Sequence, residues 1–399
     1  MNTAPAPGVL AAVRRRLARE AAEPSPSRVA AALRAEGGVL GSAEVLDTVR
    51  TLRADLTGAG PLEPLLEDPA TTDILVNGAG PVWVDDGTGL RRKPEITFTD
   101  EAQVRDLAQR LAAQAGRRLD AASPWVDAQL DNGVRLHAVL HPVARDGTCL
   151  SLRLPHRRGL SLDELRSRGG LGRFGAQLLH GLVATRTTLL VSGGTGTGKT
   201  TLLNALLGLV SPTERLVLIE DSTELRPDHP HVVRLEARPP NVEGSGSVTV
   251  EHLVRQGLRM RPDRLVVGEA RGAEVVSLLA ALNTGHEGGV STLHANAATD
   301  VPARIEALGC AAGLSREAVH SQLAAARAVV AHLSRTTTGR RRLTELCVLT
   351  RDDGDLVRAV PAVRFHDDGE SRPGPGQTQL AHRLGRWWPQ APEPGEAEQ

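Results

Sequence analysis

The period of hydrophobic positions changes repeatedly along the second half of the chain. Short apolar runs of strand length are separated by amphipathic stretches of helical length. Such alternation predicts a largely parallel sheet with helices on both faces. The predicted elements are helices at 174–185, 202–209, 250–260 and 273–282, and strands at 188–191, 216–219, 232–235, 265–267 and 290–294.

Residues 51–155 carry a different pattern, in which short β-like runs are separated by turn signals. This pattern predicts a smaller N-terminal α/β domain. Its predicted strands are 74–76, 82–84, 96–98, 134–140 and 149–154, with one helix at about 100–115. Residues 1–50 are predicted to form a short helical N-terminal region, and residues 156–172 to form a linker.

Two further helices, 301–308 and 316–333, and a hairpin turning at Asp353-Gly354 complete the predicted second domain, residues 173–366. Residues 367–399 are rich in Gly, Pro, Arg and Glu. That composition predicts a disordered tail. Trp387-Trp388 is the only feature that stands out there, interpreted as inert rather than as a docking point.

The composition narrows the partners that the chain can attract. Lys and Arg number 47, as do Asp and Glu, so no global field draws the chain to nucleic acid or to an anionic membrane. No run approaches the roughly 18 to 20 uncharged apolar residues of a membrane span. Three widely spaced cysteines fit a reducing compartment. We therefore expect a cytoplasmic protein with, at most, peripheral membrane association.

A glycine-rich segment between the strand 188–191 and the helix 202–209 fits the pattern G-x-x-x-x-G-K-[ST]. Glycines let backbone N–H groups turn toward phosphate oxygens, and the following helix presents its positive end to the same anion. Lys199 is expected to reach the β- and γ-phosphates, and the Thr200 hydroxyl to bind Mg²⁺. The predicted phosphate-binding residues are Gly193, Gly194, Thr195, Gly196, Thr197, Gly198, Lys199, Thr200 and Thr201.

Carboxylates and histidines follow neighbouring predicted strands. Glu269 follows the strand 265–267 as in a Walker B element, whose carboxylate lies beside Mg²⁺. The acidic segment 220–224 follows the strand 216–219, and a carboxylate there could polarise a water. Taken alone, each acidic cluster is more often a plain turn; beside a phosphate loop, both favour catalysis. His286 and His294 bracket the strand 290–294, which favours contact with the γ-phosphate region.

These segments together resemble the type II/IV secretion-system ATPases. The residues that carry the resemblance are the phosphate loop, Glu220 to Leu225, Arg259 to Arg264 leading into Gly268 to Gly272, and Thr284 to His286 with Ser291 to Asn296. Upstream segments resemble the tight-adherence (Flp) pilus branch, the CpaF/TadA-type ATPases. They are Gly60 to Leu66, Val76 to Gly78, Val82 to Val84 and Asp131 to Arg135.

The resemblance implies a hexameric ring of RecA-like P-loop ATPase domains, each joined to the smaller N-terminal α/β domain, with ATP and Mg²⁺ as ligands. It implies that Glu224 activates water and that Glu269 is the Walker B carboxylate. His286 and His294 match the family's histidine box. Arg135 and Arg153 match arginines that reach the phosphates, and Arg145 is a weaker match.

We therefore expect an ATPase that powers pilus biogenesis or protein secretion. Its expected partners are copies of itself and integral membrane platform proteins at the inner face of the cytoplasmic membrane. One alternative is a nucleic-acid-translocating ATPase, which the balanced charge disfavours. Another is a non-catalytic nucleotide-gated scaffold, which the acidic segment and the histidine pair disfavour.

Overall fold

The computed structural model of the chain describes residues 13, 26–35, 48–49, 58–87, 89–155, 159–238, 240, 245–283, 287–336, 339–366 and 370–389. The chain divides into two compact units, Met1–Pro155 and His156–Gln399. Within the predicted helical N-terminal region, helix α2 (Pro26–Ala35) is described, and most of the remainder lies outside the described residues.

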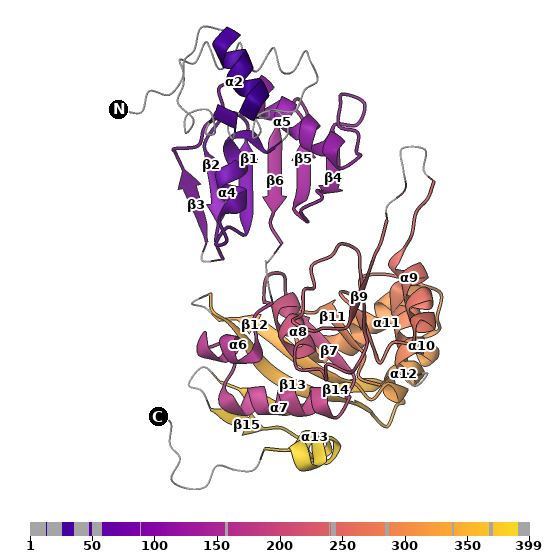
Figure 1. Cartoon of the computed structure of the whole chain (residues 1–399). Helices are drawn as coiled ribbons and strands as arrows, with labels where there is room; N and C mark the ends of the chain where they lie inside the picture. The colour runs from indigo at the N-terminus through magenta and orange to yellow at the C-terminus, as the bar shows by residue number, and fades with distance from the viewer. Residues whose placement is uncertain are drawn as a thin grey trace. The chain divides into compact units, whose positions relative to one another are not determined.

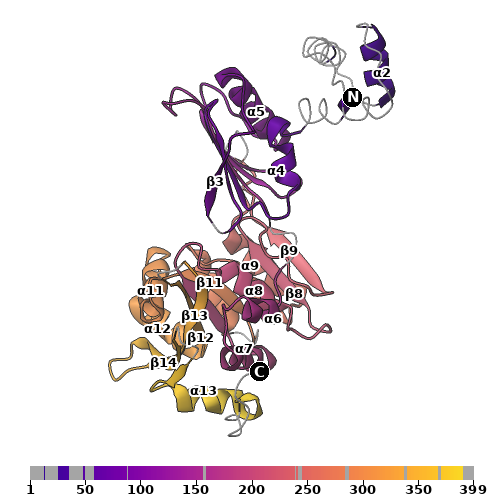
Figure 2. The same cartoon turned by 90° about the vertical axis from the view of Figure 1, so that its left-hand side faces the viewer.

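The first unit contains a six-stranded antiparallel sheet in the order β3-β2-β1-β6-β5-β4. Helix α5 (Glu101–Gln114), whose first turn is capped by the Asp100 side chain, packs on one face of the sheet (Figure 2). The strands are β1 (Asp73–Asn77), β2 (Val82–Asp85), β3 (Leu90–Lys93), β4 (Trp125–Gln129), β5 (Arg135–Val139) and β6 (Cys149–Arg153). Two short helices precede them, η1 (Gly60–Leu62) and α4 (Glu63–Glu67).

Alternate residues of these strands point to opposite faces of the sheet. Leu136 of β5 and Leu152 of β6 are buried in the core with Leu107 of α5. By the same alternation, Arg135 and Arg153 lie on the face away from α5, where they are direct cross-strand neighbours. The two arginines that the sequence singled out therefore share one patch of this unit.

Two strand assignments in the first unit differ from the sequence prediction. Residues 96–98 form no strand, although Phe98 is buried in the core, and the edge strand is β3 instead. Strand β4 was not predicted. It is an edge strand with one outward face, on which Trp125 is 59% exposed, so its apolar pattern is weak.

The second unit contains a nine-stranded mixed sheet in the order β15-β14-β13-β12-β7-β11-β10-β8-β9. Neighbours from β12 to β9 pair in parallel, and those from β12 to β15 pair antiparallel. The strands are β7 (Leu189–Gly193), β8 (Leu216–Glu220), β9 (Val232–Glu236), β10 (Arg264–Val267), β11 (Val290–His294), β12 (Val329–Arg335), β13 (Arg341–Arg351), β14 (Val357–Phe365) and β15 (Ser371–Pro373).

Helices cover both faces of this sheet, as the sequence predicted (Figure 1). Leu189 and Val191 point into one apolar layer, and Leu190 points into the other. The first layer contains α6 (Leu162–Ser167), α7 (Arg173–Ala184), α8 (Lys199–Leu207) and α13 (Gln377–Leu384). The second contains α9 (Val250–Gly257), α10 (Glu274–Leu282), α11 (Val301–Ala311) and α12 (Arg316–Ala325). Single-turn helices η2 (Leu258–Met260) and η3 (Ala298–Asp300) follow α9 and precede α11.

The helix predicted at 316–333 is wrong in its second half. Helix α12 ends at Ala325, and Arg327 takes a positive φ of 46° that turns the chain back toward the sheet. Residues 329–335 then form β12, which inserts between β7 and β13. Helix α6 likewise lies within the predicted linker and begins with a capping box between Ser161 and Glu164.

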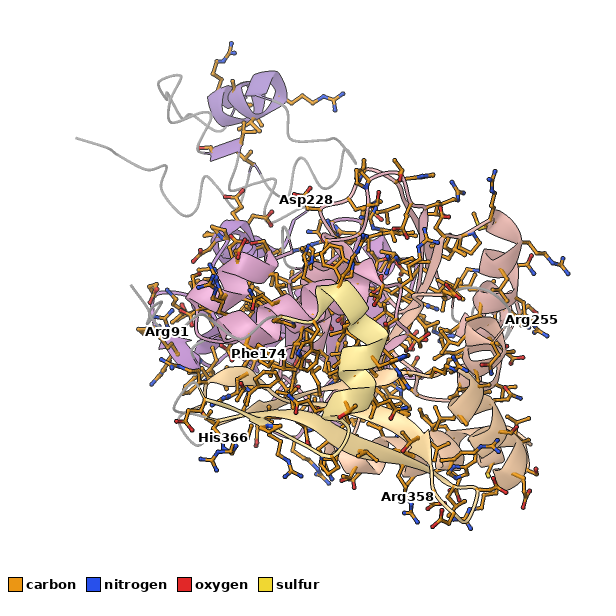
Figure 3. All side chains as sticks on the ribbon, turned by 90° about the horizontal axis from the view of Figure 1, so that it is seen from below. Arg91, Phe174, Asp228, Arg255, Arg358 and His366 are labelled. Carbon is orange, nitrogen blue, oxygen red and sulfur yellow. The ribbon has the colours of Figure 1, made fainter. Side chains whose placement is uncertain are left out.

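The tail predicted to be disordered is ordered over residues 370–389. Strand β15, α13 and the single turn η4 (Gly385–Trp387) dock on the second unit. Leu380 and Leu384 are buried beside α7. The Trp388 ring meets the ring of Phe174, which is labelled in Figure 3, edge-on at 6.0 Å between centroids. Burial of these apolar side chains offsets the conformational entropy that the segment loses on ordering. The composition alone, which favours disorder, does not show this contribution. Residues 367–369 and 390–399 lie outside the described residues.

Candidate functional site

The carboxyl ends of six parallel strands lie at one edge of the nine-stranded sheet. Register places His294 of β11 and Leu333 of β12 on either side of Gly193, the last residue of β7. Strand β10 ends at Val267 beside β11, and β8 ends at Glu220 on the other side of β10. In open α/β sheets this edge is where ligands bind.

The phosphate loop occupies the middle of this edge. Helix α8 begins at Lys199 directly after Gly198, which has a φ of +96°. Gly193 approaches its neighbours so closely that a Cβ there would lie 2.4 Å from the Leu333 carbonyl oxygen. Glycine is therefore required at this position. A helix that starts straight after such a loop offers unpaired N–H groups to an anion.

Lys199 is held inside the loop and is only 8% exposed. Its Nζ donates to the carbonyl oxygens of Gly193 at 3.0 Å and Gly194 at 2.9 Å. Burial lowers the pKa of Lys199, and nearby Glu269 opposes that shift. The buried ammonium is supported mainly by backbone carbonyls, which leaves its charge available to a ligand. The loop is therefore suited to a polyanion.

Glu269 lies between Arg271 and His294. Arg271 Nε donates to Oε2 of Glu269 at 2.7 Å. His294 Nε2 lies 2.7 Å from Oε1, but the geometry is not that of a hydrogen bond, and Oε1 has no hydrogen-bond partner among the described residues. A buried carboxylate oxygen in that condition fits a divalent cation, the ligand expected of a Walker B element.

The protonation of His294 follows from its neighbours. Lys199 Nζ lies 3.4 Å from His294 Nδ1. An ammonium can only donate, so Nδ1 accepts and the ring proton is assigned to Nε2. Burial lowers the pKa of His294; Glu269 opposes that shift, and Lys199 and Arg271 add to it. The imidazole is therefore neutral at pH 7.

Glu220 organises the acidic segment rather than facing solvent, being only 6% exposed. Its Oε1 accepts from the backbone N–H groups of Glu224 and Leu225, both at 3.0 Å. A Cβ at Gly268 would lie 2.8 Å from Glu220 Cγ, so the two strand ends are in close contact. Burial raises the pKa of Glu220 to about 7. Glu224 is thereby fixed where its charge acts on Lys199 and Arg271.

The structure thus brings most of the predicted site residues together. The phosphate loop, Glu224, Glu269 and His294 lie at one edge of the second unit. Arg135 and Arg153 lie in the first unit. His286 lies outside the described residues.

Two arginines at this edge received no role from the sequence. Arg271 pairs with Glu269, and Arg335 Nε donates to the Gly196 carbonyl oxygen at 3.1 Å. Arg271 lies within a segment that the sequence had singled out, two residues after the predicted Walker B carboxylate Glu269, so its position in the sequence could have pointed to it. Arg335 was hidden by the false helix, because only a strand at 329–335 carries it to the loop.

Comparison with known proteins adds to this geometry. Residues 55–367 match the family model described as type II/IV secretion system protein. The chain belongs to this family. The resemblance inferred from the sequence is therefore confirmed at the family level.

Individual relatives of this type II/IV secretion system protein agree. A Mycobacterium tuberculosis protein, whose name assigns it provisionally to conjugal transfer, is 59% identical over 328 residues, covering 81% of this chain and 93% of that one. VirB11 of Agrobacterium fabrum is 34% identical over 262 residues, covering 58% of this chain and 75% of VirB11.

A solved structure of the pilus retraction motor PilT with bound ADP superposes with a TM-score of 0.53. It is 22% identical and covers 74% of this chain and 83% of that one. This likeness concerns the fold. It confirms the predicted class for this family member, a RecA-like P-loop domain with a smaller N-terminal α/β domain.

Proposed function

We propose that the protein is a Mg²⁺-dependent ATPase. The main support is the Lys199 ammonium, held in a phosphate loop beside the Glu269 carboxylate oxygen that has no hydrogen-bond partner among the described residues. Anion-binding and cation-binding groups at one strand edge match the needs of a nucleoside triphosphate with its metal. ATP hydrolysis is also what the family resemblance implies.

In the proposed reaction, Lys199 and the first N–H groups of α8 bind and orient the β- and γ-phosphates. The Thr200 hydroxyl and Glu269 hold Mg²⁺, which when bound neutralises charge on the phosphate oxygens. Glu224 orients the attacking water and accepts its proton. The water oxygen attacks the γ-phosphorus, and the bond to the oxygen bridging the β- and γ-phosphates breaks, releasing ADP and phosphate.

His294 keeps this arrangement in register. Its neutral ring contacts both Lys199 and Glu269, so a shift in the position of either side chain alters the position of the other. We assign it a positioning role, and we propose that His286 acts with it as the resemblance implies. Arg135 and Arg153 are proposed to supply further positive charge to the phosphates.

Steady-state phosphate release by the full-length protein tests the enzymatic assignment. Lys199→Ala and Glu269→Gln are each expected to lose at least about 100-fold in turnover, because each removes charge stabilisation from phosphoryl transfer. Glu224→Gln is expected to keep nucleotide affinity and lose turnover. Turnover near that of the unmodified protein in Lys199→Ala and Glu269→Gln would overturn the assignment and favour the non-catalytic scaffold.

We further propose that the ATPase works as a homohexamer that powers pilus biogenesis or protein secretion, through integral membrane platform proteins at the inner face of the cytoplasmic membrane. Membership of the secretion-system family supports the motor. The upstream segments noted above favour the tight-adherence CpaF/TadA branch. Among the described helices, none is both long and apolar enough to cross a bilayer. Native mass spectrometry with ATP tests the ring, and a monomer alone would contradict it.

The name of the mycobacterial relative favours a second candidate function, movement of nucleic acid in a conjugation-type system. This function predicts ATP turnover that rises with added DNA, and DNA binding that weakens steeply with salt. The balanced charge of the chain disfavours it. Turnover measured with and without single- and double-stranded DNA separates the two functions, since a pilus or secretion motor should not respond.

A further inference from the structure

Two arginines flank the phosphate loop from a hairpin outside the motifs described above. Arg335 is the last residue of β12 and Arg341 the first of β13, and they pair directly across the two strands. Strand β12 runs parallel to β7 with Leu333 opposite Gly193. Arg335 therefore lies just beyond the point where the loop begins.

Both side chains lie close to loop glycines. Arg335 Nε donates to the Gly196 carbonyl oxygen at 3.1 Å, and a Cβ at Gly196 would lie 3.1 Å from a terminal nitrogen of Arg335. A Cβ at Gly198 would lie 3.6 Å from Arg341 Cδ. The loop glycines thus give room to these two side chains as well as to a ligand.

Positive charges are concentrated around the phosphate loop, and the fold alone does not require this concentration. Like charges directly opposite on neighbouring strands destabilise a sheet. Here the pair lies beside the N-terminus of α8, which is also positive, and beside Lys199. No acidic side chain of the described residues forms an ion pair with Arg335. An anion bound in the loop would relieve this repulsion.

The sheet order tells which part of a nucleotide the pair would meet. Glu269 and His294 stand on the β11 and β10 side of the loop, and the arginines stand on the β12 side. Lys199 is turned toward His294. The bond-breaking end of a triphosphate belongs with the carboxylates, which leaves the α- and β-phosphates for the other side.

We propose that Arg335 and Arg341 bind the α- and β-phosphates of the nucleotide from within the same subunit. Arg335 uses Nε to hold the Gly196 carbonyl and keeps its terminal nitrogens for a phosphate oxygen, as the five donors of a guanidinium allow. The pair contributes to ground-state affinity and not to the chemical step. This inference rests on the proposed function, because it needs a nucleotide in the loop.

The test is calorimetric titration with Mg-ADP at several salt concentrations. The full-length unmodified protein and its Arg335→Gln and Arg341→Gln variants are compared. Each variant is expected to raise the Kd of ADP about 10- to 100-fold, the effect of losing one charge-assisted hydrogen bond. Their Kd should depend less on salt. The KM of ATP should rise in parallel, with kcat within about threefold of the unmodified value.

Arg342→Gln is the matched control. This neighbouring arginine donates to the His366 carbonyl oxygen, away from the loop, so its removal should leave the Kd of ADP unchanged. Thermal unfolding without nucleotide separates ligand binding from loop support. The Arg335 and Arg341 variants should melt at the unmodified temperature or slightly above it, because a repulsion is removed, and should show a smaller upward shift with ADP.

The outcomes are distinct. If the unmodified protein does not bind ADP, the proposed function fails. If it binds ADP and Lys199→Ala does not, while both arginine variants bind with unchanged Kd and salt dependence, the proposed function stands and this inference is overturned. A lower melting temperature without nucleotide, together with an unchanged salt dependence, would also overturn it, since the arginines would then only support the loop.

Discussion

Glu220 should make the stability of the second unit depend on pH in the direction opposite to that of most carboxylates. Its side chain is buried at the end of β8, against Gly268. Burial raises its pKa to about 7, against 4.5 for an ordinary glutamate. Nearby Glu224 and Glu236 raise it further, and the two backbone N–H donors only partly oppose the shift. The folded protein therefore holds this proton at pH values where the unfolded chain has lost it.

The magnitude follows from the difference between the two pKa values. Between pH 4.5 and pH 7 the folded state binds more protons than the unfolded state, so the free energy of unfolding falls as pH rises. The whole shift corresponds to about 3 kcal/mol. The contribution is fully present below pH 4.5 and is lost as pH passes through 7. Between about pH 6 and pH 8 alone it amounts to about 1 kcal/mol.

Glu220→Gln is the perturbation that isolates this effect. The amide keeps an acceptor for the N–H groups of Glu224 and Leu225 but does not titrate. Urea unfolding of both proteins at pH 6, 7 and 8 should show the variant gaining stability relative to the unmodified protein as pH rises, by about 1 kcal/mol overall. A difference that stays constant with pH, or that grows in the other direction, would refute the reasoning.

Three further changes test other parts of the structure. Glu214→Ala leaves the 3%-exposed Arg264 without its buried ion pair and should lower the free energy of unfolding by about 3 to 5 kcal/mol in urea titration. Gly181→Leu places a side chain where Trp387 now lies within 3.2 Å, so the docked tail should become accessible to limited proteolysis. Gly193→Ala pushes a methyl group against a carbonyl oxygen and should abolish detectable ADP binding in calorimetry.

Matched controls for these changes lie in the same chain. Glu251 forms an exposed pair with Arg255 one helical turn away, so Glu251→Ala should alter stability by less than about 0.5 kcal/mol. A methyl group at Gly172 would meet nothing within 4 Å, so Gly172→Ala should bind ADP normally and keep the tail docked. Equal losses in a change and its control would show that the named contacts are not the cause.

Much of the second unit could be predicted because its central strands are buried on both faces. Such strands appear in the sequence as uninterrupted apolar runs, as in residues 216–219 and 265–267, bounded by polar groups. Their carboxyl ends also carry the candidate site. Glu269 and His294 could therefore be placed at the site from sequence alone, as residues following or ending predicted strands.

The failures have equally specific causes. Residues 326–333 follow a helix with no glycine or proline to mark its end, and an apolar run of that length suits a helix or a strand equally well. The helix ends because Arg327 adopts a left-handed conformation, which no composition rule predicts. The pairing of Arg271 with Glu269 depends on side-chain geometry, so the motif that contains both residues does not disclose it.

The position of β12 has a consequence for how binding and catalysis are divided. Because β12 joins the sheet on the far side of β7 from β11, the loop receives carboxylates and His294 from one side and two arginines from the other. In the proposed reaction, groups on the first side act where a bond breaks, and groups on the second act where the nucleotide stays intact after hydrolysis. An ATPase built this way can retain ADP after its phosphate has left. Substitutions on the two sides should therefore separate into losses of kcat and losses of affinity.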